Sequence, residues 1–364
     1  MRFTESGFNM KKLLYIGRPN LGENLFATPC LELLSNEYEI TFLAPQHTLP
    51  VFTKYTFLKR VLPNCNPSSL YQRLPLLTRT ALNNILKDGD WQYAYHHDDD
   101  ILFLQNNPEI SHIKKYPVLH DREIDISSNT HSSNRFLSRT KKYMLKLQLM
   151  TLEQTLTYDC TVRRPSNNLQ NYSSYKNAVI VYEGSRECLR KLPLKTIHKF
   201  VKVLPNAIYF VTQKTAIDLQ FIKNDIKFII IDPFSDNSLN KIIEIFESGP
   251  KVMIGPDSGL TQLASGYKIP LIWLQSRIVL EDVIDNQYKK YCKIYLRPNL
   301  TCKQDCLGCL ATENLKTNTN PYGVFEVKKE LRKGYKNLEC FINKTPVCLQ
   351  YSEQEVEEII NLIN

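Results

Sequence analysis

The sequence lacks any apolar run long enough to cross a bilayer as a helix. Its first ten residues also lack the basic start and apolar core of a signal peptide. Ten cysteines without a secretory signal argue against a disulfide scaffold, because thiols stay reduced inside cells. We therefore expect a cytoplasmic protein without a transmembrane segment, with peripheral binding to the inner face of an anionic membrane as the alternative location.

The composition is that of an ordinary globular protein. Hydrophobic residues make up 43% and charged residues 23% of 364 residues, which is enough chain for two domains. The formal net charge of +9 favours an anionic partner. A sugar nucleotide, a phosphorylated glycolipid, a membrane surface or a nucleic acid would each satisfy that charge, so the charge does not choose among them.

Apolar and polar segments alternate as in an α/β protein. Residues 11–17 and 39–44 read as buried strands, and residues 23–34 between them read as a helix. This order predicts a parallel, doubly wound sheet. After a polar stretch at 165–174 a second such series begins, with strands expected at 178–182, 208–211, 228–231, 251–254 and 271–274. We expect two Rossmann-like halves with a ligand cleft at the carboxyl ends of their strands.

A basic segment lies at 135–147, where apolar residues recur at helical spacing between arginines and lysines. One interpretation is a surface helix that packs one face on the core. The other is a basic face, including Lys141, that meets a phosphorylated acceptor or a membrane surface.

A polar turn between two apolar strands carries the strongest local signal. Asp257 and Ser258 are good N-cap residues, and Gly259 leaves the first helical turn bare. Free backbone N–H groups and the positive end of the helix dipole would then face a bound phosphate. A plain capped helix start is the alternative interpretation.

Three motifs together resemble the ADP-heptose:lipopolysaccharide heptosyltransferases, glycosyltransferase family 9. Residues 255–274 resemble the signature D-[ST]-G-x-x-H-L-A, with Gln262 in place of its histidine. Residues 16–29 resemble the first loop, R-x-x-x-G-D-x-x-x-x-x-P, with Gly22-Glu23 for Gly-Asp. Residues 182–193 resemble the element G-[AST]-x(n)-K-x-W-P, with Arg190 at the lysine position and Lys191 beside it.

The resemblance implies a GT-B fold of two facing Rossmann-like domains, and a sugar transfer from a nucleotide-diphosphate donor. An inverting transfer needs a carboxylate that takes the proton from the acceptor hydroxyl. By resemblance Glu23 is the leading base, and an ordinary first-turn glutamate is the alternative. The acidic triplet after His96-His97 could also hold a base with a raised pKa, or could be a solvated loop; its members are Asp98, Asp99 and Asp100.

Positive charge is needed where the diphosphate leaves. Arginine and lysine suit phosphate, and the second motif places both after a strand of the second half, although a basic surface turn would look the same. The full expected donor-binding set is Gly22, Asn24, Ser185, Arg186, Arg190, Lys191, Asp257, Ser258, Gly259 and Gln262.

The cysteines cluster near the C-terminus. The spacing Cys306-x2-Cys309 lets one turn offer two thiolates to a metal, and tetrahedral thiolate sites suit zinc or iron. The arrangement resembles the iron finger of the bacterial autotransporter heptosyltransferases. We expect a structural zinc or iron ion, with reduced, unliganded thiols as the alternative, and no cofactor for catalysis. The expected ligands are Cys306, Cys309, Cys340 and Cys348, with Cys302 as the alternate.

The predicted protein is thus a heptosyltransferase-like enzyme whose acceptor is a lipopolysaccharide core sugar or a protein hydroxyl. A non-catalytic nucleic-acid- or glycan-binding protein with a metal finger and a GT-B sugar-nucleotide epimerase are the alternatives. Nucleic acid is disfavoured, because the cysteine segment lacks basic residues interleaved with aromatics. The expected domains are an acceptor-side domain at 1–170, a donor-binding domain at 175–300, a cysteine-rich finger at 301–349 and a C-terminal helix at 350–364.

Overall fold

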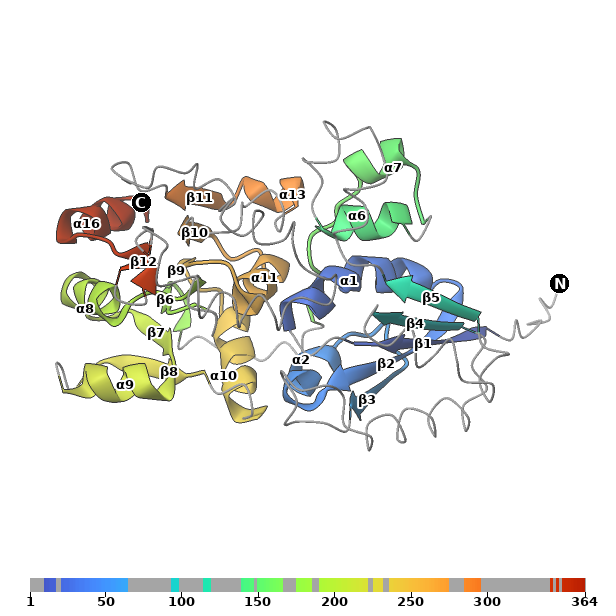
Figure 1. Cartoon of the computed structure of the whole chain (residues 1–364), viewed down its shortest axis with the longest axis horizontal. Coiled ribbons are helices and arrows are strands. Elements are labelled where there is room, and N and C mark those ends of the chain that lie inside the picture. The colour runs from blue at the N-terminus through green and yellow to red at the C-terminus, as the bar shows by residue number, and fades with distance from the viewer. Residues whose placement is uncertain are drawn as a thin grey trace.

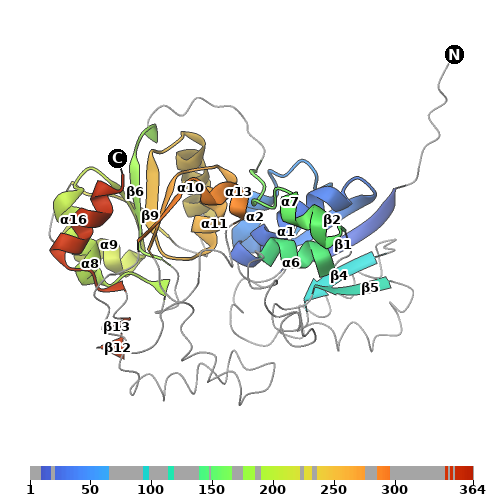
Figure 2. The ribbon, with the colours of Figure 1, turned by 90° about the horizontal axis from the view of Figure 1, so that it is seen from above.

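The chain forms two parallel sheets, each with helices packed on it, and the two sheets lie side by side (Figures 1 and 2). This computed structural model describes residues 10–17, 21–64, 93–97, 114–118, 139–146, 149–165, 175–184, 190–221, 225–231, 236–274, 285–295, 341–342, 345–346 and 349–363. None of the helices within these ranges is both long and apolar enough to cross a bilayer.

The first sheet has the strand order β3-β2-β1-β4-β5, and all its pairings are parallel. The last four residues of the central strand β1 are buried, as expected for a parallel strand covered on both faces. The elements of this half are β1 (Lys11–Ile16), α1 (Leu21–Leu34), β2 (Tyr38–Pro45), the 3₁₀ helix η1 (Gln46–Thr48), α2 (Leu49–Phe52), β3 (Arg60–Asn64), β4 (Tyr93–His97), β5 (Lys114–Val118), α6 (Arg139–Lys146) and α7 (Leu152–Thr157).

The second sheet has the order β11-β10-β9-β6-β7-β8, again wholly parallel. Counted from its own first strand, this is the order 6-5-4-1-2-3 of a complete Rossmann sheet. Its elements are β6 (Val179–Tyr182), α8 (Leu194–Val203), β7 (Ile208–Val211), α9 (Gln213–Gln220), β8 (Lys227–Ile230), α10 (Asp236–Glu247), β9 (Val252–Gly255), α11 (Gly259–Gly266), β10 (Leu271–Leu274), α13 (Asn286–Lys289) and β11 (Cys292–Tyr295).

The chain ends in a short antiparallel pair and a helix. These elements are β12 (Phe341–Ile342), β13 (Thr345–Pro346) and α16 (Glu353–Asn361). Ser352 caps α16 in a capping box with Glu355, and the helix packs on α8. Oγ1 of Thr196 donates to the carbonyl of Leu349 at 2.9 Å and holds the start of this segment on the second half. A helix was predicted at 350–364, and one forms there over Glu353–Asn361.

One hydrophobic core runs across both halves. It joins buried side chains of the first sheet, such as Phe42, to buried side chains of α10 and α11, such as Phe246 and Leu263. Helix α1 packs against α11, and α2 packs against α10. Because apolar contacts are non-directional and proportional to buried area, this shared core stabilises the two halves as one packed unit.

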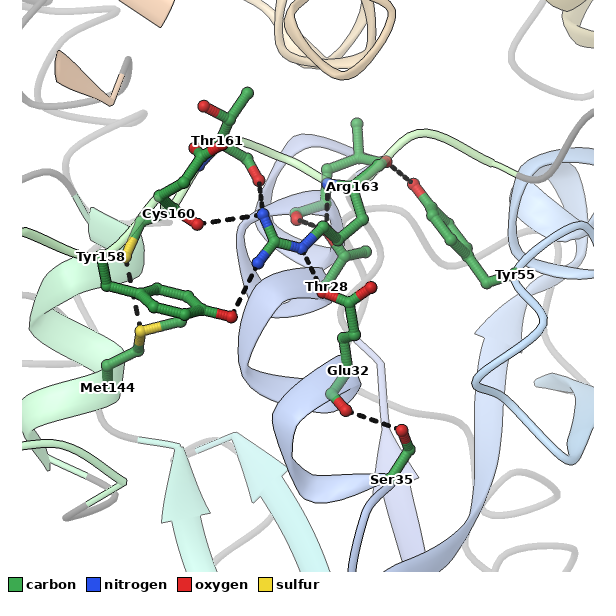
Figure 3. A network of polar contacts seen from close by, with 11 residues as sticks. Thr28, Glu32, Ser35, Tyr55, Met144, Tyr158, Cys160, Thr161 and Arg163 are labelled. Carbon is green, nitrogen blue, oxygen red and sulfur yellow. Dashed lines mark hydrogen bonds and ion pairs between the residues drawn. The ribbon is translucent and has the colours of Figure 1, made fainter. Parts of the chain in front are cut away.

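Arg163 fastens the segment that follows α7 to helix α1 (Figure 3). Its guanidinium pairs with the carboxylate of Glu32 and also donates to the hydroxyl of Tyr158 at 2.9 Å. Its backbone N–H donates to Oγ1 of Thr28 at 3.0 Å, and its carbonyl accepts from the hydroxyl of Tyr55 at 2.7 Å. The segment is therefore held both by the backbone hydrogen bonds of Arg163 and by the ion pair of its side chain.

The basic-face interpretation of segment 135–147 is wrong for Lys141. This residue lies on α6 but is 2% exposed, and its ammonium pairs with Asp285 at the start of α13. Desolvating an ammonium is unfavourable unless a counter-charge is buried with it, so Lys141 serves packing between the halves. The short elements β5, α13 and β11 were not predicted, and the polar stretch at 166–174 lies outside the described residues.

Candidate active site

The candidate site lies where the second sheet reverses its strand order. Strands β6 and β9 are neighbours there, and the next strands along the chain lie on opposite sides of them. In open α/β sheets ligands bind outside the carboxyl ends of the strands at this point. Glu183 directly follows β6, and Pro256 and Asp257 directly follow β9, so these side chains come from adjacent strand ends.

Glu183 is a buried carboxylate that holds the ammonium of Lys191. It is 2% exposed, and its Oε1 lies 2.7 Å from Nζ of Lys191. It also accepts from the backbone N–H of Thr212 and from Oγ1 of Thr215, both at 2.6 Å. The Lys191 side chain is 32% exposed. A half-buried cation is therefore held in place by a carboxylate that Thr212 and Thr215 also fix.

Gly184 allows the chain to turn back beside this pair. Its φ is +108°, which is a conformation that residues with a Cβ rarely adopt. A Cβ at this position would collide with the carbonyl oxygen of Arg190. Gly184 and Lys191 form an isolated antiparallel bridge, which sets Arg190 and Lys191 next to the end of β6.

Asp257 links the second cation to helix α11. Its Oδ2 accepts from Nη1 of Arg190 at 2.8 Å, and its Oδ1 accepts from Nε2 of Gln262 at 3.2 Å. Asp257 is 4% exposed, whereas the Arg190 side chain is 26% exposed. As at Glu183, a buried carboxylate fixes the direction of a more exposed cation.

The start of α11 is capped as its sequence predicts. Oγ of Ser258 accepts from the backbone N–H of Leu260 at 3.1 Å, and Oγ1 of Thr261 accepts from the backbone N–H of Ser258 at 2.8 Å. Burial raises the pKa of Tyr182, against a smaller lowering by its hydrogen bond to Ser258, so the Tyr182 hydroxyl stays neutral. The N-terminus of α11 is thus an ordered, buried helix start.

The N-terminal turns of α1 and α11 meet backbone to backbone. A Cβ added to Gly259 would lie 2.9 Å from the backbone nitrogen of Gly22 and 3.1 Å from Cβ of Leu21. A Cβ on Gly22 would lie 3.2 Å from Cα of Gly259. The first and last of the three predicted motifs therefore touch, at a contact that is too close for a Cβ on Gly259 and tight for one on Gly22.

Several predicted site residues are thus brought together at one place. Arg190, Lys191, Asp257 and Gln262 lie at the switch point, and Gly22, Ser258 and Gly259 lie at the meeting of the two helix starts. Asn24, in the first turns of α1, is fully buried. Glu23 belongs to α1, but its side chain is outside the described part of the structure. Also outside it are Ser185, Arg186, Asp98, Asp99 and Asp100.

Cys302, Cys306, Cys309, Cys340 and Cys348 lie outside the described residues. Within the described ranges, no three histidine, cysteine or acidic side chains come together as a metal ion would require. Cys30 and Cys160 are buried free thiols, and Cys292 is half-buried.

Sequence reasoning missed the role of Glu183 and its two threonine neighbours. Thr212 and Thr215 follow β7, and nothing in their local sequence links them to a residue 29 or more positions earlier. A usable signal was an acidic residue at the end of an apolar strand, directly before a glycine and a basic segment. Buried carboxylates are uncommon unless they are paired, so this position favoured a nearby cation.

Comparison with known proteins gives a fold but no close relative. No protein-family model matches the sequence, and no curated protein matches it. A family 9 glycosyltransferase from Veillonella parvula DSM 2008 superposes with a TM-score of 0.61 at 13% identity, over 97% of each chain. ADP-heptose lipopolysaccharide heptosyltransferase II of E. coli gives 0.56 at 13% identity, over 84% of this chain and 98% of its own.

A third solved structure with a similar fold contains iron. The dodecameric glycosyltransferase TibC from enterotoxigenic E. coli H10407 gives a TM-score of 0.52 at 11% identity, over 97% of this chain and 76% of TibC. These likenesses extend over both sheets of the chain, because they cover 84% or more of it. The chain therefore has the GT-B fold of the family 9 glycosyltransferases, as its three motifs predict.

Proposed function

We propose that the chain is an inverting glycosyltransferase that moves a sugar from a nucleoside-diphosphate donor to a hydroxyl acceptor. The observation that supports it is the pair of cations at the switch point, Arg190 and Lys191, each held by a buried carboxylate. Cations fixed in this way suit the charge that develops on a departing diphosphate. In this proposal the half with β6 to β11 binds the donor, and the half with β1 to β5 faces the acceptor.

The proposed reaction is a direct displacement. The carboxylate of Glu23 takes the proton from the acceptor hydroxyl while that oxygen forms a bond to the anomeric carbon of the donor. The bond from this carbon to the diphosphate oxygen breaks, and its electron pair leaves with the diphosphate. Arg190 and Lys191 neutralise the leaving group, so the proposal needs no catalytic cofactor. The alternate bases are Asp98, Asp99 and Asp100.

The proposed donor is ADP-heptose, and the proposed acceptor is a lipopolysaccharide core sugar or a protein hydroxyl. The structurally similar E. coli heptosyltransferase II, an ADP-heptose lipopolysaccharide heptosyltransferase, supports ADP-heptose with a lipopolysaccharide acceptor. The net charge of +9 favours a phosphorylated glycolipid, and also peripheral contact with an anionic membrane.

We also propose a structural zinc or iron ion at the cysteine cluster. The supports are the Cys306-x2-Cys309 spacing and the iron in the structurally similar TibC. Elemental analysis of purified protein tests it: one metal per chain is expected, and its loss is expected from Cys306→Ser or Cys309→Ser but not from Cys292→Ser. Metal-free protein purified without chelator would contradict the proposal.

The deciding experiment is binding and transfer by the wild-type protein. A ligand that binds only the folded state raises the melting temperature by mass action. ADP-heptose is expected to do so, and radiolabelled heptose is expected to move to lipopolysaccharide core or to acceptor protein. If no ADP- or UDP-sugar shifts the melting temperature, the transferase proposal fails. If a sugar nucleotide binds and is converted in the absence of acceptor, the epimerase function takes its place.

A substitution series tests which carboxylate is the base. Glu23→Gln should lower kcat by about 10²–10⁴-fold, the contribution typical of a general base, and leave donor affinity unchanged. Glu37, exposed just beyond the end of α1, provides the matched control Glu37→Gln, which should keep full activity. If Glu23→Gln is active and Asp98→Asn, Asp99→Asn or Asp100→Asn is not, the base belongs to the acidic triplet.

A further inference from the structure

The amide of Gln262 has a fixed direction. Oδ1 of Asp257 lies 3.2 Å from Nε2 of Gln262, and Asp257 is turned toward the helix by its ion pair with Arg190. A carboxylate only accepts hydrogen bonds, so the amide must present its N–H₂ group to Asp257. Turning the amide over would set its oxygen against a carboxylate oxygen, which is repulsive.

The other end of this amide is an acceptor without a donor. Gln262 is 1% exposed, and no hydrogen-bond donor in the described part of the chain reaches its Oε1 atom. A buried acceptor left in this way is less favourable than a satisfied one, because it has lost its hydrogen bonds to water without replacing them. A donor supplied by a bound molecule would recover that free energy, which makes Oε1 a candidate ligand contact.

The position of Gln262 connects this acceptor to the candidate site. The residue lies in the first turn of α11, and its Cγ lies 4.0 Å from the position that a Cβ on Gly22 would occupy. It therefore stands where the starts of α1 and α11 meet, next to the cations that would hold the diphosphate. Because Oε1 is covered in this structure, the groups over it must move aside before a ligand can reach it.

The chemistry of the acceptor decides what can bind it. The oxygens of an ionised diphosphate carry no protons, so they repel Oε1 instead of bonding to it. A sugar hydroxyl can donate. We propose that Oε1 of Gln262 accepts a hydrogen bond from a hydroxyl of the donor sugar and helps to select that sugar. This inference rests on the proposed transferase function, and it assigns Gln262 to the sugar and not to the diphosphate.

Calorimetry with ADP and with ADP-heptose separates the two assignments. Gln262→Met keeps the length and apolar stem of the side chain but has no carbonyl oxygen. It is expected to weaken ADP-heptose binding about tenfold and to change ADP binding less than twofold. Gln213→Met, at an exposed position on α9, is the matched control and should leave both affinities unchanged.

Two results would overturn the inference while leaving the proposed function intact. An equal loss for ADP and ADP-heptose in Gln262→Met would assign the amide to the nucleotide diphosphate. Unchanged affinity for both would make Oε1 an internal acceptor only. If the wild-type protein binds neither compound, the proposed function fails, and this inference fails because it rests on that function.

A second measurement does not depend on the stability of the variant. Analogues of ADP-heptose that each lack one hydroxyl are compared on wild-type protein, where the analogue missing the contact hydroxyl should bind about tenfold more weakly than ADP-heptose. Gln262→Met should not discriminate against that analogue. If the wild-type protein binds every such analogue as tightly as it binds ADP-heptose, the assignment is contradicted.

Discussion

Nζ of Lys141 lies 3.5 Å from Oδ2 of Asp285, and the two side chains are 3% and 1% exposed. The lysine belongs to α6 in the first half of the chain, and the aspartate is the N-cap of α13 in the second. Oδ1 of Asp285 accepts from the backbone N–H of Gln287 at 3.0 Å, so one carboxylate both caps a helix and joins the two halves.

Lys141→Met should destabilise the protein strongly. It leaves the Asp285 carboxylate buried without its counter-charge, and breaking one side of a buried pair typically costs about 3–5 kcal/mol. Urea denaturation measures the loss. The control is Lys202→Met. Lys202 pairs with Glu353 on the surface, where the two side chains are 66% and 63% exposed, so its loss should change stability little. Equal effects of the two substitutions would show that burial of the Lys141 pair is unimportant.

The same pair should make stability depend on pH in a known direction. Burial raises the pKa of Asp285 above its ordinary value of 3.8, and the hydrogen bond from Gln287 and the charge of Lys141 oppose that rise only in part. The folded state therefore binds a proton more tightly than the unfolded state. The contribution of Asp285 to stability is complete below pH 3.8 and is lost as pH rises through the folded-state pKa.

Comparison with Asp285→Asn isolates this effect. Asparagine keeps the helix cap but does not titrate. The free energy of unfolding of the wild type, minus that of Asp285→Asn, should fall as pH is raised from 3 to 6. Urea titrations at steps of pH measure it, and a difference that instead grows with pH would mean that Lys141 lowers the pKa of Asp285.

Gly259→Ala should push the starts of α1 and α11 apart. Its new methyl group would lie 2.9 Å from the backbone nitrogen of Gly22, which is closer than real contacts allow. Alanine is favoured over glycine in a helix by about 1 kcal/mol, so any net loss reports the clash. We expect a net destabilisation of about 1–3 kcal/mol. Gly22→Ala, with a closest approach of 3.2 Å, should lose less. A stabilised Gly259→Ala protein would contradict this contact.

The alternation of apolar segments was enough to predict the sheets. Runs such as Ile208–Val211 and Leu271–Leu274 are buried along their whole length, so their composition alone marks them as central parallel strands. The edge strand β11 (Cys292–Tyr295) was not predicted, since two of its four residues are exposed and its pattern is that of a surface segment. The apolar composition of a strand follows from how deeply it is buried. An edge strand is less buried than a central one, so its sequence is harder to recognise.

The site was predictable in its residues but not in its pairings. Arg190 and Asp257 were expected from the motifs, yet the ion pair between them spans 67 positions and depends on β6 and β9 being neighbours. Lys141 was misjudged for a similar reason, because its partner Asp285 is brought to it by the other half of the chain. A single sequence carries the residue types but not these long-range contacts.

Lys191→Met should weaken the binding of ADP about tenfold. Hydrogen bonds to charged groups contribute about 1.5–3 kcal/mol, and the ammonium is already oriented by Glu183. Lys195→Met, at an exposed position in the first turn of α8, is the matched control. Calorimetry at two salt concentrations measures the loss. Equal effects of the two variants would mean that only the net charge of the region matters.

The thiols of Cys30, Cys160 and Cys292 should resist alkylation in the folded protein. Burial raises the pKa of Cys160 and of Cys292 to about 12, and raises that of Cys30 further. Only the thiolate reacts with iodoacetamide, and at pH 8 roughly one thiol in ten thousand with such a pKa is ionised. Mass spectrometry of peptides after brief labelling should find these three cysteines unmodified in the native protein and modified in urea. Labelling of Cys160 at the same rate in both conditions would show that the segment held by Arg163 opens to solvent far more readily than its hydrogen bonds imply.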